Sequence, residues 1–199
     1  AQGKTGSERF LSAFARWYTP LVALGAAVLA AVTLAVTVKL GELRYARFEF
    51  CQYSSRYDRF KKGEIMNAFN PQMGNAAVMD LGVYAIHSLV KLLGKPDMDS
   101  IHAKSVKLRN GFEGMGTVLL SYGSFQAEVL YSKLSDSLQP SIIMGENGSL
   151  SIGKLSVPEK VFLHLRGCEP EEITFETRPN NMEFEVQEFV RLINTKEVD

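Results

Sequence analysis

Three polar side chains in one predicted helix have the types and spacing that proton transfer requires. Residues 74–94 carry apolar side chains at steps of mostly three and four, which predicts a helix with one broad apolar face. On an ideal helix Asp80, Tyr84 and His87 lie on adjoining turns. An acid, a phenol and an imidazole within reach of one another are the components of general acid–base catalysis. The alternative is a core helix whose tyrosine and histidine have ordinary structural partners.

A polar segment precedes this helix. Residues 55–73 lack periodicity, contain Asn70-Pro71 near their end, and carry a basic patch made of Arg56, Arg59, Lys61 and Lys62. Two interpretations remain open: a solvated loop, or a loop that reaches over a pocket, as long aperiodic loops often do.

The rest of the chain after residue 41 is dominated by predicted strands. Residues 41–54 alternate with period two, and seven more short alternating segments follow residue 100. Asn110-Gly111, Gly123-Ser124 and Asn147-Gly148 are typical hairpin turns, so the strands that they join must be antiparallel. Apolar spacing predicts a closing helix at 180–194. The fold class is therefore α+β: a large, mostly antiparallel open sheet with helices packed on one face, which leaves the other face available for a partner.

The first forty residues differ from the rest. Residues 18–38 contain no charged side chain, and about 20 apolar residues are enough to cross a bilayer as a helix. A cleaved signal peptide and a buried helix of a soluble protein are the alternatives. We therefore divide the chain into an amphipathic lead-in with an apolar, transmembrane-like helix at 1–40, which offers membrane contact through residues 18–38, and a folded domain at 41–199.

Composition argues against several classes of function. Lys and Arg together number 22, as do Asp and Glu, so the formal net charge is zero and nucleic-acid binding is disfavoured. Cys51 and Cys168 have neither C-x-x-C spacing nor nearby histidine ligands, so we expect no metal site and two ordinary buried thiols.

The body of the chain resembles the C-terminal domain of the glucose–fructose oxidoreductase/inositol dehydrogenase (Gfo/Idh/MocA) family, in its dihydrodiol dehydrogenase-like form. The resemblance covers residues 41–194 and is most specific at Asn70-Pro71 and at Asp80-Leu-Gly82-Val-Tyr84-Ala-Ile-His87. It implies a cytoplasmic oxidoreductase that uses NAD(P) and acts on a sugar, polyol or diol. Tyr84 would donate or accept the proton at the substrate oxygen, Asp80 would orient the substrate or the phenol, and His87, Asn70 and Pro71 would contact a small polyhydroxylated substrate. A carboxylate beside Tyr84 would raise the pKa of the phenol, which favours a neutral proton donor.

One part of the family pattern is absent. The sequence has no strand–GxGxxG–helix unit, so we assign no residue to cofactor binding. We expect a truncated, substrate-binding half of an oxidoreductase that lacks its Rossmann domain and is inactive alone. The alternative is a non-catalytic assembly module that forms homo-oligomers through the open face of the sheet.

Residues 1–35 are similar to a different family. The stretch KTGSERFLSAFARWYTP and the apolar run after it resemble the third transmembrane helix region of heavy-metal P-type ATPases. None of the catalytic motifs of that family is present, so this part would supply a membrane anchor. We expect a chimeric chain joined between residues 33 and 41; a fragment of a metal-transporting ATPase is the remaining alternative for residues 1–35.

Overall fold

The computed structural model describes residues 38–155, 160–173 and 182–195. The strands are β1 (Leu43–Cys51), β2 (Asp97–Lys107), β3 (Glu113–Ser121), β4 (Gln126–Ser132), β5 (Ser141–Gly145), β6 (Gly148–Ile152), β7 (Val161–Leu165) and β8 (Glu171–Ile173). The helices are α2 (Tyr57–Lys61), the 3-10 turns η1 (Asn67–Phe69) and η2 (Pro71–Met73), the π-helix η3 (Val78–Gly82), α3 (Val83–Leu93) and α4 (Met182–Thr195). The predicted α+β class, strands and closing helix are confirmed.

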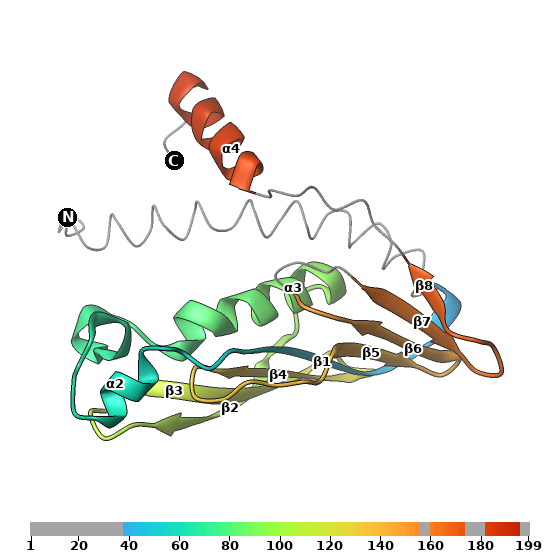
Figure 1. Cartoon of the computed structure of the whole chain (residues 1–199). Helices are drawn as coiled ribbons and strands as arrows, with labels where there is room; N and C mark the ends of the chain where they lie inside the picture. Colours follow the sequence, from blue (N-terminus) through green and yellow to red (C-terminus); the bar gives the residue numbers. More distant parts are fainter. Residues whose placement is uncertain (1–37, 156–159, 174–181, 196–199) are drawn as a thin grey trace.

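The strands of the described residues form one eight-stranded sheet with the order β2-β3-β4-β1-β5-β6-β7-β8 (Figure 1). All neighbours are antiparallel except β1 and β4, which are parallel. The three predicted hairpins join β2 to β3, β3 to β4, and β5 to β6. Because β1 and β4 run in the same direction, their carboxyl ends meet at one edge, where Cys51 is paired with Ser132.

The sheet buries the face that α3 covers (Figure 1). The predicted alternation in β1 is confirmed at its centre, since Ala46 and Phe48 are fully buried while Tyr45 and Arg47, on the other face, are only half-buried. Phe48 is paired with Val129 of β4, and both side chains pack in one core with Ala85 and Leu89 of α3. Burial of these apolar side chains anchors α3 over the centre of the sheet.

The predicted helix at 74–94 forms in two parts. It begins as η3, a π-helix at Val78–Gly82, and continues as α3 from Val83 until Gly94, whose φ of 83° ends it. The Glu113 carboxylate on β3 accepts a hydrogen bond from the Val78 backbone N–H at 3.1 Å. The π turn changes the angular spacing that an ideal α-helix would give to Asp80 and the residues after it, and such turns often occur at functional sites.

The segment at 55–73 contributes to a second core, so the interpretation as a purely solvated loop is wrong. Phe60 is 2% exposed, and Phe69 and Phe112 are fully buried. Their rings pack in one cluster with Tyr57, and the centroids of neighbouring rings are 5.0 to 6.1 Å apart. The aromatic side chains of the segment, Tyr57, Phe60 and Phe69, anchor it to this core despite its many charged residues.

The face of the sheet opposite α3 carries mixed side chains. Tyr45 and Met144 are cross-strand partners and therefore lie on one face, where the Tyr45 hydroxyl donates to Glu128 at 2.6 Å. Leu119, which is paired with Glu128, is 52% exposed. Assembly of homo-oligomers through this face stays a prediction.

The predicted apolar helix at 18–38 lies, except for Val38, outside the described residues. Within the described ranges no helix combines the length and the apolar character needed to cross a membrane.

The two cysteines are free thiols but are not both buried. Cys51 is half-buried, and burial raises the pKa of its thiol to about 11, so that this thiol stays protonated near neutral pH. Cys168 is exposed, which contradicts the expectation of two buried thiols. It follows Gly167 in the turn between β7 and β8, where no core is available to cover it.

Candidate functional site

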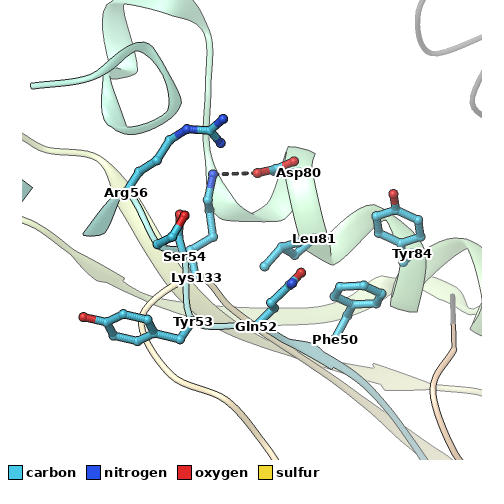
Figure 2. Close-up of a pocket in the computed structure, with 10 residues that line it drawn as sticks. Phe50, Gln52, Tyr53, Ser54, Arg56, Asp80, Leu81, Tyr84 and Lys133 are labelled. Carbon is cyan, nitrogen blue, oxygen red and sulfur yellow. Dashed lines mark hydrogen bonds and ion pairs between the residues drawn. The ribbon is translucent and has the colours of Figure 1, made fainter. Parts of the chain in front are cut away.

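A cavity of about 380 Å³ lies where β1 and β4 end. Past the end of the paired strands, the Gln52 backbone N–H donates to the Ser132 carbonyl at 2.9 Å and the Ser54 N–H donates to the Lys133 carbonyl at 3.0 Å. The side chains that line the cavity include Phe50, Gln52, Arg56, Asp80, Tyr84 and Lys133 (Figure 2). The parallel pairing of β1 and β4 thus brings the loop after β1 and the residue after β4 to one place, beneath η3 and α3.

Lys133 is a buried cation in the cavity wall, with 5% of its surface exposed. Its ammonium donates to Asp80 Oδ2 at 2.5 Å and to the Ala68 carbonyl at 3.2 Å (Figure 2). It also lies over the rings of Phe69 and Phe112, 5.1 and 5.7 Å from their centroids. A carboxylate, a carbonyl and two aromatic faces together compensate for the desolvation of the charge.

Asp80 belongs both to the pocket and to this ion pair. Its side chain is 58% exposed, and only Oδ2 contacts Lys133. Within the described residues Oδ1 has no hydrogen-bond partner, so that oxygen is available to a ligand. The effect of the Asp80 carboxylate on the pKa of Tyr84 stays a prediction.

Tyr84 lies at the other end of the cavity (Figure 2). Its ring stacks on Phe50, with centroids 4.6 Å apart and an interplanar angle of 19°. The stack fixes the ring plane while the residue remains half-buried, so the phenol stays at the cavity wall.

The other three predicted site residues do not line this cavity. The Nε2 atom of His87 is buried and has no hydrogen-bond partner in the described part of the chain. Burial, followed by the charge of Lys91, lowers the pKa of His87, so its imidazole is neutral at pH 7. Asn70 Oδ1 accepts a hydrogen bond from the Gln72 N–H at 3.0 Å, and Pro71 begins η2. The roles of His87, Asn70 and Pro71 in substrate binding stay predictions.

Gly82 permits the close approach of the helix to the sheet. A Cβ atom at this position would lie 3.1 Å from the Tyr131 ring and 3.1 Å from a methyl group of Val78. Burial and Glu113 raise the pKa of Tyr131, which is therefore a neutral structural phenol beneath the helix. The glycine thus sets the height of η3, and with it the position of Asp80, above β4.

We expect Gly82→Val to lower the free energy of unfolding by about 2 to 3 kcal/mol, because the added side chain overpacks this contact. Urea unfolding measures the change. Met79→Val is the matched control, since it introduces a β-branched residue into the same π-helix at a side chain that is 63% exposed. Equal unfolding midpoints for the two variants would contradict the prediction that a side chain at residue 82 overpacks the contact with Tyr131.

Sequence reasoning missed Lys133 and did not single out Arg56 within its basic patch. Lys133 ends one of the short alternating segments after residue 100, and the sequence pattern gives it no partner. Its carboxylate lies 53 residues away, and only the parallel pairing of β1 with β4 brings the two segments together. A lysine that ends an apolar strand, with a single carboxylate on the covering helix, is the signal that could have suggested the pair.

Comparison with known proteins identifies relatives that match most of the chain. A family model described as the GFO/IDH/MocA C-terminal domain matches residues 29–151. Over 161 residues the chain is 39% identical to scyllo-inositol 2-dehydrogenase (NADP(+)) IolU of Bacillus subtilis and 41% identical to the uncharacterized oxidoreductase YgjR of Escherichia coli. The match covers 81% of this chain and 48% of each relative, so the chain spans about half of their length.

Solved structures agree on the fold. The crystal structure of aldose-aldose oxidoreductase from Caulobacter crescentus, complexed with glycerol, superposes with a TM-score of 0.67 at 16% identity and covers 88% of this chain and 52% of that one. The family match begins at residue 29 and crosses residues 33–41, the range of the expected junction. The comparisons give no support to the resemblance of residues 1–35 to P-type ATPases or to a chimeric chain.

Proposed function

The chain belongs to the GFO/IDH/MocA family through its C-terminal domain, and from this premise we propose that it forms the substrate side of an NAD(P)-dependent oxidoreductase. The substrate is a small polyhydroxylated molecule, a sugar, polyol or diol. The names of the relatives support this class: one is an NADP(+)-dependent inositol dehydrogenase, and a structural neighbour is an aldose-aldose oxidoreductase.

One observation carries the proposal: a phenol and a lysine-bound carboxylate line the same cavity. Interconversion of a secondary alcohol and a carbonyl requires a group that passes a proton at the substrate oxygen. Tyr84, held on Phe50, is that group. Asp80 accepts a hydrogen bond from a substrate hydroxyl through Oδ1 while Lys133 holds Oδ2.

The residues of this chain do not fit a dinucleotide by themselves. The sequence contains no Gly-rich strand–loop–helix unit that would hold a pyrophosphate. When it is bound in a family member, the nicotinamide accepts or supplies the hydride. The residues described above bind and orient the substrate and move its proton.

A nicotinamide-linked turnover assay tests this function. The chain is assayed as part of a protein that also carries a dinucleotide-binding domain, with NAD(H) and NADP(H) against inositols, hexoses, pentitols and vicinal diols, as the wild type and as the Tyr84→Phe variant. Turnover of a polyhydroxylated alcohol or of its ketone that depends on this hydroxyl is the expected result. Turnover that is insensitive to Tyr84 would contradict the assignment.

A further prediction concerns Lys133 as a positioning residue. We expect Lys133→Met to lower kcat/KM about 10- to 100-fold, because Asp80 then loses the partner that fixes it. Methionine keeps an unbranched apolar chain against Phe69 and Phe112, so the variant should fold. Because Asp80 is more than half exposed, its unpaired charge remains solvated.

A double-mutant cycle separates positioning from a general structural effect. If Lys133 acts through Asp80, Lys133→Met has little further effect on kcat/KM in an Asp80→Asn background. Additive losses in the two single variants and the double variant would contradict that role. Lys104→Met, on the exposed edge strand β2, controls for the loss of one charge.

A further inference from the structure

Arg56 is a cation in the cavity wall that has no counter-charge. It precedes α2 and is exposed, and its guanidinium lies at the Lys133 end of the cavity (Figure 2). Within the described residues no hydrogen bond or ion pair engages this side chain. The other charged groups of the lining, Lys133 and Asp80, neutralise each other at 2.5 Å. The lining therefore carries one uncompensated positive charge.

The absence of a partner sets Arg56 apart from its neighbours and from the other arginines. On the same short segment Arg59 pairs with Glu64, and Lys61 pairs with Asp58 at 2.7 Å. Every other arginine among the described residues also has a partner; these are Arg44, Arg47, Arg59, Arg109, Arg166 and Arg191. The guanidinium at the cavity is thus the exception among the arginines of the described residues.

The surroundings of Arg56 suit an anion. The hydroxyl-bearing residues Ser54 and Ser55 line the cavity next to it, and the Lys61–Asp58 pair is joined to Tyr53, whose hydroxyl donates to Asp58 at 2.7 Å. The nearby carboxylate of Asp58 is therefore already engaged and does not compete for Arg56. A guanidinium binds a carboxylate or phosphate through two parallel hydrogen bonds, which neutral hydroxyls cannot match in strength.

We propose that Arg56 forms an anion subsite and that the substrate is an acidic or phosphorylated member of the sugar and polyol class. This inference rests on the proposed function and narrows its substrate. Figure 2 shows Arg56 and Tyr84 at opposite ends of the cavity. The anionic group therefore binds away from the reacting carbon, which lies at Tyr84.

Matched ligand pairs test the subsite by calorimetric titration of the chain. Glucuronate and glucose 6-phosphate are compared with glucose, and myo-inositol 1-phosphate with myo-inositol, so that each pair differs in its anionic group. We expect at least one anionic member to bind roughly five- to tenfold more tightly than its neutral partner, and Arg56→Gln to abolish the difference while affinity for the neutral member changes by less than about twofold. The carboxylate and phosphate arms distinguish the two anions. Equal affinities within both pairs would overturn the inference.

Two controls make the result specific to Arg56. Lys62→Gln removes the same charge from the same segment at an exposed residue that does not line the cavity, and it should leave the preference intact. Weaker NADP(H) binding by Arg56→Gln, with the preference unchanged, would assign the guanidinium to a cofactor phosphate and overturn the proposal.

The outcomes also distinguish the anion subsite at Arg56 from the proposed oxidoreductase reaction. An anion preference that depends on Arg56, in a protein without nicotinamide-linked turnover, would support the subsite and contradict the proposed reaction. Turnover that depends on Tyr84 but shows no preference for anionic substrates would support the reaction and contradict the subsite.

Discussion

Replacing Tyr84 with phenylalanine is expected to lower kcat for the nicotinamide-linked oxidation of a polyhydroxylated substrate about 10²- to 10⁴-fold, the range typical of general acid–base catalysis. The ring remains stacked on Phe50, so the substitution removes one hydroxyl and leaves the shape of the cavity unchanged. Steady-state kinetics in both directions measure the effect. Because the phenol acts at the reacting oxygen, kcat should fall more than KM rises.

Tyr57→Phe is the matched control for this prediction. Tyr57 packs in the second core, its ring lies 5.6 Å from that of Phe69, and it does not line the cavity. Its variant should retain kcat within about twofold and unfold near the wild-type midpoint. A Tyr84→Phe variant with wild-type kcat would remove Tyr84 from the chemistry and leave the Asp80–Lys133 pair as the candidate.

The strands and their hairpins were predictable because they depend on local pattern. Period-two alternation identified β1, and Asn-Gly or Gly-Ser turns identified three antiparallel pairs. The insertion of β1 between β4 and β5 was not predictable, because alternation specifies which face a side chain occupies and says nothing about which strand lies beside it. That insertion is what creates the cavity.

Only the part of the candidate site that lies on one helix was predictable, because helical periodicity relates residues within a helix and not residues on different elements. Asp80 and Tyr84 were placed on one helix, and both line the cavity. The π turn was not foreseen, since it depends on tertiary contacts: Glu113 bonds the Val78 N–H, and Gly82 approaches Tyr131. Lys133 was missed for the same reason, because its partner becomes a neighbour only when the sheet has formed.

Phe69→Ala should produce the largest loss of stability, about 3 to 5 kcal/mol in the free energy of unfolding. Phe69 is fully buried between Phe60 and Phe112, with ring centroids 5.5 and 5.0 Å away, and truncation leaves a cavity that the aromatic neighbours cannot fill. Guanidinium unfolding monitored by tyrosine fluorescence measures the change. Phe125→Ala, at a half-buried ring outside this core, is the control and should have a clearly smaller effect.

Phe69→Leu distinguishes lost packing from the lost aromatic face. Leucine restores most of the buried apolar surface but gives the Lys133 ammonium, 5.1 Å from the ring centroid, no π-system. We expect a remaining loss of about 1 to 2 kcal/mol, the size of a desolvated cation–π contact. That loss should shrink in a Lys133→Met background, where no cation remains. If the loss does not shrink, packing alone accounts for the contribution of Phe69 to stability. The Ala68 carbonyl and Asp80 are then the groups that hold Lys133 at the cavity.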